Sequence, residues 1–219
     1  MNLAIFDFDG TLLTRDTLPA LAKEWLRQKR SRAKVIVIYL SLIPTFIRYK
    51  LRLINREKFK NIAFDKFNRI YQGMTKKEIN EFFQSAYPNL KKKFNTTVIK
   101  EIRTARQQKF HCVLLSGSYA DLLRIVAHDL GIDTVIGAEL AFREGIVDHR
   151  GVPFINGKKK VALLQKTFTG KIVNWDSSRC FADSVADIEL MQLVGEPVAV
   201  NPDPGLLSYA LENQWKIVG

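Results

Sequence analysis

Short apolar runs alternate with helical patterns over most of the chain, and this alternation limits the fold more than any other feature of the sequence. Runs typical of buried strands lie at 3–8, 111–116, 133–138, 179–182, 197–201 and 215–218. Helical patterns lie at 119–131, 157–168 and 184–195, and a last helix is expected before 215. Neighbouring parallel strands need crossovers of this kind. We therefore predict an α/β fold with a doubly wound parallel sheet, which binds ligands at the carboxyl ends of its strands.

Residues 14–93 interrupt the alternation. They lack a strand-like pattern, and their apolar residues recur at helical spacing in 21–28, 56–72 and 76–87. We predict a helical cap domain at 14–93, inserted after the first strand, and a catalytic core formed by 1–13 and 94–219. A small hairpin turning at Glu144-Gly145 is expected within 139–151.

The charge is concentrated in the same segment. The chain has a net charge of +12, and residues 14–93 hold 20 of its 34 Lys and Arg but only 6 of its 22 Asp and Glu. The remainder, with 14 basic and 16 acidic residues, is close to neutral. This distribution disfavours a nucleic-acid binder, and no obligate protein partner is indicated. A basic cap over a near-neutral core favours an anionic substrate or an anionic membrane surface, and solvated helix faces are the alternative.

One stretch of the insertion, 35–47, carries no charge and contains Pro44. It is too short to cross a bilayer, which takes about 20 apolar residues. The first interpretation is a helix buried within the cap. The alternatives are a membrane-interface helix between basic residues and a partner-binding face.

The cysteines and histidines indicate neither disulfides nor zinc. Cys112 and Cys180 have no metal-ligand or disulfide-like spacing, and the three histidines form no ligand pattern. The first residues, MNLAIFDFDG, place acids where a signal peptide would be apolar. We expect a cytoplasmic protein, in peripheral contact with a membrane if the basic cap binds one.

Four polar motifs follow predicted strands or begin predicted helices: Asp7-Phe8-Asp9-Gly10-Thr11, Ser116-Gly117-Ser118, Lys158-Lys159-Lys160 and Asp183-Ser184-Val185-Ala186-Asp187. Singly, each has an ordinary explanation as a helix cap, a turn or a solvated lysine cluster. Asp7 is the exception, because a carboxylate in an apolar strand is costly without a metal or a partner. Together, the motifs predict acids, a hydroxyl and a lysine at one edge of the sheet, where they could handle a phosphate.

These motifs resemble those of the haloacid dehalogenase (HAD) superfamily, specifically the phosphoserine phosphatase-like subgroup, subfamily IB. The matching stretches are IFDFDGTL, VLLSGSY, GKKKVALL and FADSVADIELMQLVGEPVAVNPDPGL. The resemblance implies a magnesium-dependent phosphatase in which Asp7 takes the phosphoryl group as an aspartyl-phosphate and Asp9 is the general acid and base.

The resemblance also implies the binding residues. Mg²⁺ would be held by the carboxylates of Asp7 and Asp183 and the backbone carbonyl of Asp9, and Asp187 would support its waters. Ser116, the N–H of Gly117 and one lysine would hold the phosphoryl oxygens. We choose Lys160 over Lys158 because the Lys-Val-x-x-Leu run from Lys160 better matches the family's third motif. Asp16 stands where the subgroup has an acid that meets the substrate's amino group.

Several positions depart from the subgroup and disfavour phosphoserine as the substrate. Ala186 replaces an asparagine of the fourth motif, and Ser118 replaces a glycine of the second. The register of the cap puts Phe67 where an arginine grips the serine carboxylate, with Arg69 nearby. We predict a phosphatase of a small phosphorylated metabolite. The alternatives are a phospholipid-headgroup phosphatase at a membrane surface, a phosphotransferase using the same intermediate, and a non-catalytic binding module.

Overall fold

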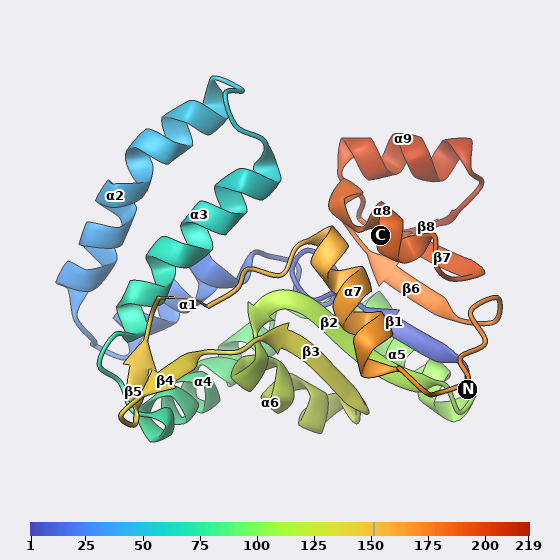
Figure 1. Ribbon diagram of the computed structural model, residues 1–219, viewed down its shortest axis with the longest axis horizontal. Helices are drawn as coiled ribbons and strands as arrows, with labels where there is room; N and C mark the ends of the chain where they lie inside the picture. The colour runs from blue at the N-terminus through green and yellow to red at the C-terminus, as the bar shows by residue number, and fades with distance from the viewer. Residues whose placement is uncertain (151) are drawn as a thin grey trace.

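The computed structural model, which describes residues 1–150 and 152–219, contains a parallel sheet between two layers of helices (Figure 1). Its six strands run in the order β3 (Thr134–Ala138), β2 (His111–Tyr119), β1 (Leu3–Phe6), β6 (Arg179–Ala182), β7 (Glu196–Val200) and β8 (Lys216–Val218). Every pair of neighbouring strands in it is parallel. The predicted α/β fold with a doubly wound parallel sheet is confirmed.

Alternate residues of each strand face opposite helical layers. Leu3 and Ile5 of β1 belong to the core beneath α7 (Gly157–Thr167), α8 (Ile188–Met191) and α9 (Pro204–Glu212). Ala4 and Phe6 belong to the core beneath α5 (Thr96–Gln107) and α6 (Ala120–Leu130). Successive side chains of a strand point to opposite faces, so a run that is apolar at every position becomes a strand covered on both sides.

The insertion after β1 is helical, as predicted. It contains α1 (Thr17–Arg27), α2 (Arg32–Lys50), α3 (Arg56–Asn68), the 3₁₀ turn η1 (Arg69–Tyr71) and α4 (Lys76–Lys91). Ser31, Asn55 and Thr75 begin α2, α3 and α4, and the side chain of each accepts a hydrogen bond from the backbone N–H three residues later. These caps satisfy donors that a helix start leaves unpaired.

Part of the insertion is anchored to the sheet by aromatic side chains. Tyr119, at the end of β2, stacks on Phe64 of α3 and Phe83 of α4 with centroid distances of 5.1 and 5.7 Å. Its hydroxyl donates a hydrogen bond of 2.7 Å to Oδ1 of Asn68. One continuous apolar core therefore crosses the predicted boundary between cap and core, and the division into two domains stays a prediction.

The uncharged stretch 35–47 forms most of α2, and the expectation that it is buried is wrong. Val35, Ile38 and Thr45 are the buried residues of α2, whereas most of its other apolar side chains are exposed. The physical reason is that α2 has neighbours on one side only: it packs on α3 and η1 and stands away from the sheet (Figure 1). Among the described residues, no helix has both the length and the apolar character needed to cross a membrane.

The predicted hairpin within 139–151 is present as β4 (Ala141–Arg143) and β5 (Ile146–Asp148). Both residues of its turn, Glu144 and Gly145, have positive φ. The helix expected at 184–195 is instead the 3₁₀ turn η2 (Val185–Asp187) followed by the short α8. After α8, the backbone N–H of Gly195 donates a hydrogen bond of 2.9 Å to the Trp175 carbonyl, just before β7 begins at Glu196.

Candidate active site

A cavity of about 540 Å³ lies where β1, β2 and β6 end, with α2 and α3 forming its far wall. Residues from all four sequence motifs line it. The residues predicted for the site are all among them: Asp7, Asp9, Asp16, Ser116, Gly117, Lys160, Asp183 and Asp187. The carboxyl ends of parallel strands meet at one edge of a sheet, which explains how Asp7 comes to lie beside Asp183, a residue from the other end of the chain.

Asp7 follows β1 directly and is buried. Its N–H donates to the carbonyl of Phe181 on β6 at 2.9 Å, so the strand pairing continues up to this residue. The loop beyond it depends on Gly10, which has a φ of +83°. A Cβ on Gly10 would lie 2.2 Å from Oδ2 of Asp183, so only glycine lets the two acid motifs approach this closely.

Asp7, Asp183 and Asp187 form a buried carboxylate cluster. One oxygen from each lies within 4.8 Å of the others. Burial, and next the charge of Asp7, raises the pKa of Asp183 to about 7, and burial also raises the pKa of Asp187. Like charges this close oppose ionisation unless a cation offsets them.

Lys160 is the cation present within this cluster. Its Nζ lies 2.9 Å from Oδ1 of Asp7 and 2.8 Å from Oδ1 of Asp187. Burial disfavours its charge, but Asp187 and Asp7 outweigh that effect and raise the pKa of the Lys160 ammonium. Lys158 is exposed at the start of α7 and does not line the cavity.

Replacing Lys160 with Ala is expected to lower the free energy of unfolding by about 3 kcal/mol, because it leaves buried carboxylates without their cation. Urea unfolding at neutral pH without divalent ions measures this. Lys158→Ala is the matched control and is expected to stay within about 0.5 kcal/mol of the wild type. Equal effects of the two substitutions would contradict the role of the buried ion pairs.

The carboxylate cluster fits a hard divalent cation. Three carboxylates face one ammonium, so negative charge is in excess, and all of the donors are oxygens, which Mg²⁺ prefers. Oδ1 of Asp187 is buried, and its neighbour of opposite charge is the Lys160 ammonium at 2.8 Å. Asp9 does not contribute its carboxylate to the cluster.

The side chain of Asp9 is held by the start of α1 instead. Its Oδ1 accepts a hydrogen bond of 2.9 Å from the N–H of Thr17 and another from the Thr17 hydroxyl. Burial is the main cause that raises the pKa of Asp9 to about 7. A carboxyl group that is fixed in place and titrates near neutral pH can both donate and accept a proton there.

Ser116 and Gly117 lie on β2, across the cavity floor from Asp7. The buried Ser116 hydroxyl accepts a hydrogen bond of 3.2 Å from the N–H of Ser118, which fixes its oxygen. A Cβ at Gly117 would lie 2.8 Å from the Ile155 carbonyl, so this position has no room for a side chain. The second motif therefore offers a hydroxyl and a compact backbone to an anion in the cavity.

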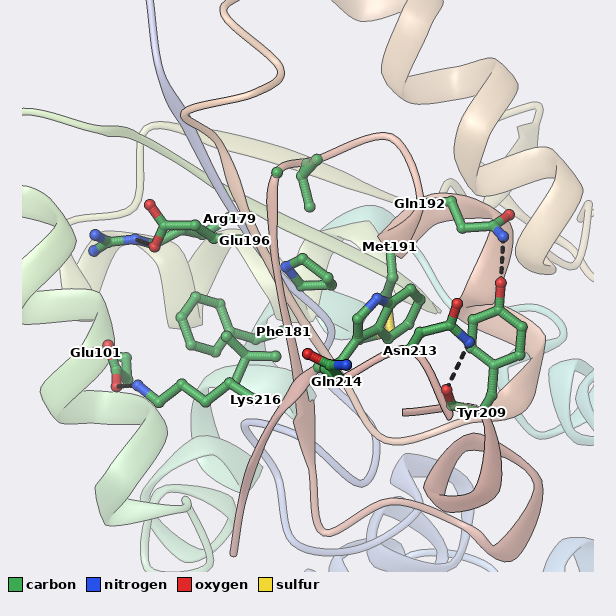
Figure 2. A pocket seen from close by; sticks show the side chains of 15 residues that line it. Glu101, Arg179, Phe181, Met191, Gln192, Glu196, Tyr209, Asn213, Gln214 and Lys216 are labelled. Atoms are coloured by element: carbon green, nitrogen blue, oxygen red, sulfur yellow. Dashed lines mark hydrogen bonds and ion pairs between the residues drawn. The ribbon is translucent and has the colours of Figure 1, made fainter. Parts of the chain in front are cut away.

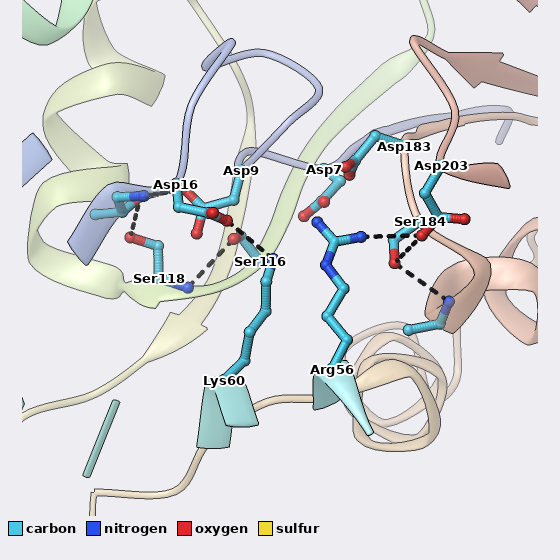
Figure 3. Close-up of polar contacts among 12 residues, drawn as sticks. Asp7, Asp9, Asp16, Arg56, Lys60, Ser116, Ser118, Asp183, Ser184 and Asp203 are labelled. Atoms are coloured by element: carbon cyan, nitrogen blue, oxygen red, sulfur yellow. Dashed lines mark hydrogen bonds and ion pairs between the residues drawn. The ribbon is translucent and has the colours of Figure 1, made fainter. Parts of the chain in front are cut away.

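Two cavity residues, Arg56 and Lys60, were not predicted from the sequence. Both extend from α3 toward the acids at the sheet edge (Figure 3). Lys60 forms an ion pair of 3.0 Å with Asp16, and Arg56 one of 2.9 Å with Asp203. Arg69, which the cap register puts near the substrate, is exposed and outside the cavity lining. The sequence feature that could have indicated Arg56 and Lys60 is their spacing of four residues, which puts both on the same face of a helix.

Above its polar floor the cavity is apolar. Its upper wall consists of aliphatic and aromatic side chains from α2, α3 and the segment before α7: Ile38, Tyr39, Leu42, Tyr49, Phe59, Phe64, Phe67 and Phe154. The position that the cap register assigned to an arginine, Phe67, is part of this wall. A bound phosphate ester would therefore have its phosphate on the polar floor and its remaining atoms against apolar surface.

A second hollow, of about 630 Å³, lies by β7, β8 and α9 (Figure 2). It contains none of the four motifs. Its charged side chains are paired with one another: Glu101 lies 3.2 Å from Lys216, and Arg179 lies 2.7 Å from Glu196. The cavity at the carboxyl ends of the strands is therefore the candidate active site.

The model of one protein family, described as haloacid dehalogenase-like hydrolase, matches residues 4–192. The chain belongs to this family. The predicted membership in the HAD superfamily is thereby confirmed. Among known relatives, this HAD chain is 29% identical over 105 residues to phosphoserine phosphatase SerB1 of Mycobacterium tuberculosis, a match that covers 48% of this chain and 34% of that protein. The chain spans less than half of the length of several such relatives, from 27% to 43%.

Solved structures share the fold over the whole chain. A protein of unknown function from Bordetella pertussis Tohama I has a TM-score of 0.83 at 21% identity, with 100% of this chain and 98% of that one covered. A phosphoserine phosphatase, solved as a phospho-aspartyl intermediate analogue, has a TM-score of 0.61 at 15% identity, with 99% and 92% covered. At these identities the likeness concerns the fold alone.

Proposed function

We propose that this HAD-family chain hydrolyses a phosphate monoester, with Mg²⁺ bound, through an aspartyl-phosphate on Asp7. The main support for the proposal is the position of Asp7, which follows a central strand and lines the cavity. One of its carboxylate oxygens lies within 4.8 Å of oxygens of two more buried carboxylates, and Lys160 contacts it. The relatives named phosphatases support the same reaction class. Hydrolysis of an aryl phosphate by the purified protein with Mg²⁺ is the first test.

The reaction has two displacements at phosphorus. In the first, an oxygen of Asp7 forms a bond to phosphorus, and the bond from phosphorus to the ester oxygen breaks. In the second, a water oxygen attacks the same phosphorus and the bond to Asp7 breaks, which releases inorganic phosphate. Lys160, the Ser116 hydroxyl and the Gly117 N–H would hold the phosphoryl oxygens through both steps.

Asp9 supplies and removes the protons. In its neutral form it protonates the departing ester oxygen, and as a carboxylate it takes the proton of the attacking water. Thr17 fixes the Asp9 carboxyl group through two hydrogen bonds, so the group does not have to be ordered when the substrate binds.

The metal would be held by the carboxylates of Asp7 and Asp183 and by the backbone carbonyl of Asp9, with Asp187 supporting its waters. When bound, Mg²⁺ would neutralise the negative charge that Asp7 and the phosphate bring together. The chain's own contribution is to bury the carboxylates and keep their oxygens within 4.8 Å of one another.

Replacing Asp9 with Asn is expected to lower kcat by about 10²- to 10⁴-fold for alkyl phosphates, because their leaving groups need a proton. The loss should be smallest for p-nitrophenyl phosphate, whose leaving group departs as a stable anion. Comparing kcat across a series of leaving groups measures this dependence. Equal losses throughout the series would mean that Asp9 acts through the structure of the loop and not through proton transfer.

The apolar wall of the cavity favours a second candidate substrate class, a phosphate monoester on an apolar or lipid-like group. A small polar metabolite does not need aromatic side chains around it, yet Phe59, Phe64 and Phe67 all line this cavity. We expect a short-chain lipid phosphate to have a higher kcat/KM than glycerol phosphate, because it removes apolar surface from water. The opposite order would favour the small-metabolite phosphatase.

A further inference from the structure

The outer face of α2 exposes a continuous row of large apolar side chains. We call Ile36, Leu40, Ile43 and Ile47 the α2 stripe. Their spacing of four, three and four residues puts them on one side of a helix, and each is 49–59% exposed. Tyr39 and Phe46 extend the stripe on one side and are 51% and 47% exposed. A contiguous apolar surface of this kind on a protein marks a place where something binds.

The exposed apolar surface continues around the tip of the helical pair. Leu51 and Leu53, in the turn between α2 and α3, are 65% and 66% exposed. Figure 1 shows that this turn is the end of the pair that stands farthest from the sheet. The stripe and the tip together form a surface that can be reached without moving any other part of the chain.

The segment that forms this surface is positively charged. Residues 28–53 include seven Lys and Arg and no Asp or Glu. Two of these cations lie in line with the stripe: Arg32 is one turn before Ile36 and Lys50 one turn after Ile47, and both are exposed. Apolar side chains flanked by cations match the surface of an anionic bilayer, whose acyl chains and headgroups attract the two kinds of residue separately.

We propose that the α2 stripe and the α2–α3 tip dock the protein on an anionic phospholipid membrane, with α2 lying in the interface plane. An in-plane position follows because α2 does not have the length and apolar character to cross a bilayer. A second copy of the chain is a poorer occupant, since two such surfaces would bring fourteen positively charged residues together.

Docking at this surface would bring the membrane next to the candidate active site. Ile38 and Leu42, on the other side of α2, line the cavity, and Tyr39 both lines the cavity and belongs to the exposed surface. The apolar cavity wall is thus continuous with the proposed membrane contact. The docking itself does not require catalysis, so it can be tested on protein with or without activity.

Co-sedimentation of the full chain with phospholipid vesicles tests the proposal. We expect the protein to pellet at low salt with vesicles of phosphatidylcholine and phosphatidylglycerol, to be released in large part at high salt, and to stay in solution with phosphatidylcholine alone. Protein that remains in solution with anionic vesicles at low salt would overturn the proposal.

Paired substitutions localise the contact. The double variant Ile36→Ser, Leu40→Ser is expected to lower partitioning into anionic vesicles by about 10- to 100-fold, because it removes two exposed aliphatic side chains that the membrane would bury. The matched control is Leu207→Ser, Leu211→Ser, which changes two exposed leucines four residues apart on α9 and should leave partitioning unchanged. Far-UV circular dichroism and thermal unfolding check that both variants fold, as expected for exposed positions.

Two results would contradict the assignment of α2. Equal losses in the α2 and α9 variants would mean that binding is a general property of exposed apolar residues. A wild-type dimer that dissociates in the α2 variant, with vesicle binding unchanged, would identify the stripe as a contact between copies of the chain. The variant Asp7→Asn should bind vesicles like the wild type, which separates this result from any failure of the proposed phosphatase function.

Discussion

Replacing Asp7 with Asn is expected to reduce the hydrolysis of p-nitrophenyl phosphate by about 10⁴-fold or more, because the amide cannot accept the phosphoryl group as a carboxylate does. The fold should be retained, since the amide has nearly the same size and the substitution removes one of three crowded negative charges. Steady-state kinetics on the wild type and the variant measure the loss, and circular dichroism checks the fold.

A matched control for this substitution is Asp65→Asn, which changes an exposed aspartate of α3 that does not line the cavity. It should keep the activity of the wild type. A covalent phosphoenzyme, trapped by acid during turnover and released by hydroxylamine, should form in the control and be missing in Asp7→Asn. Near-normal activity of Asp7→Asn would exclude Asp7 as the nucleophile.

Removing divalent ions with a chelator is expected to reduce activity by at least about 100-fold, and adding Mg²⁺ should restore it. Asp7, Asp183 and Asp187 repel one another in the folded state, so a bound cation should also stabilise the fold. At an Mg²⁺ concentration near 100 times the dissociation constant, the gain is about 2.7 kcal/mol, which corresponds to a rise in Tm of about 5 °C or more for a chain of this size.

The thermal shift gives a measurement that does not depend on turnover. Asp183→Asn should raise the Mg²⁺ concentration needed for activity and reduce the Tm rise, whereas Asp65→Asn should change neither. Full activity in excess chelator, together with no effect of Mg²⁺ on the Tm, would exclude a metal at the carboxylate cluster.

We expect the preference between lipid and metabolite substrates to depend on the apolar wall of the cavity, which comes from other segments than the catalytic floor. The floor comes from strand ends and helix starts, where Asp7, Ser116 and Asp183 are fixed by backbone hydrogen bonds and by close packing at Gly10. The apolar wall comes from α2 and α3 and shares its helices with the exposed stripe. Substitutions in the wall should therefore change the substrate preference while the chemistry on Asp7 is unaffected.

Local sequence patterns were sufficient to predict the parallel sheet and the polar residues at the carboxyl ends of its strands. A strand such as LAIF in β1 is apolar at every position, so it must be covered on both faces, and a sheet with that property is parallel and crossed by helices. Once the topology is known, the ends of β1, β2 and β6 must meet, and the polar motifs attached to them must meet as well. The positions of Asp7, Ser116 and Asp183 around one cavity follow from that rule.

The tertiary structure decided what the helices of the insertion contact. The sequence of α2 is equally compatible with burial and exposure, because the apolar residues of 35–47 surround the helix and no local signal says how many sides have neighbours. Only the packing of α3 and η1 on one side leaves the stripe exposed and turns Arg56 and Lys60 toward the acids. The sequence by itself therefore determined the parallel sheet and the polar motifs at the ends of its strands, because the residues that form both are close together in the chain. The exposure of α2 and the cations over the site depend instead on contacts between distant segments, which no local pattern encodes.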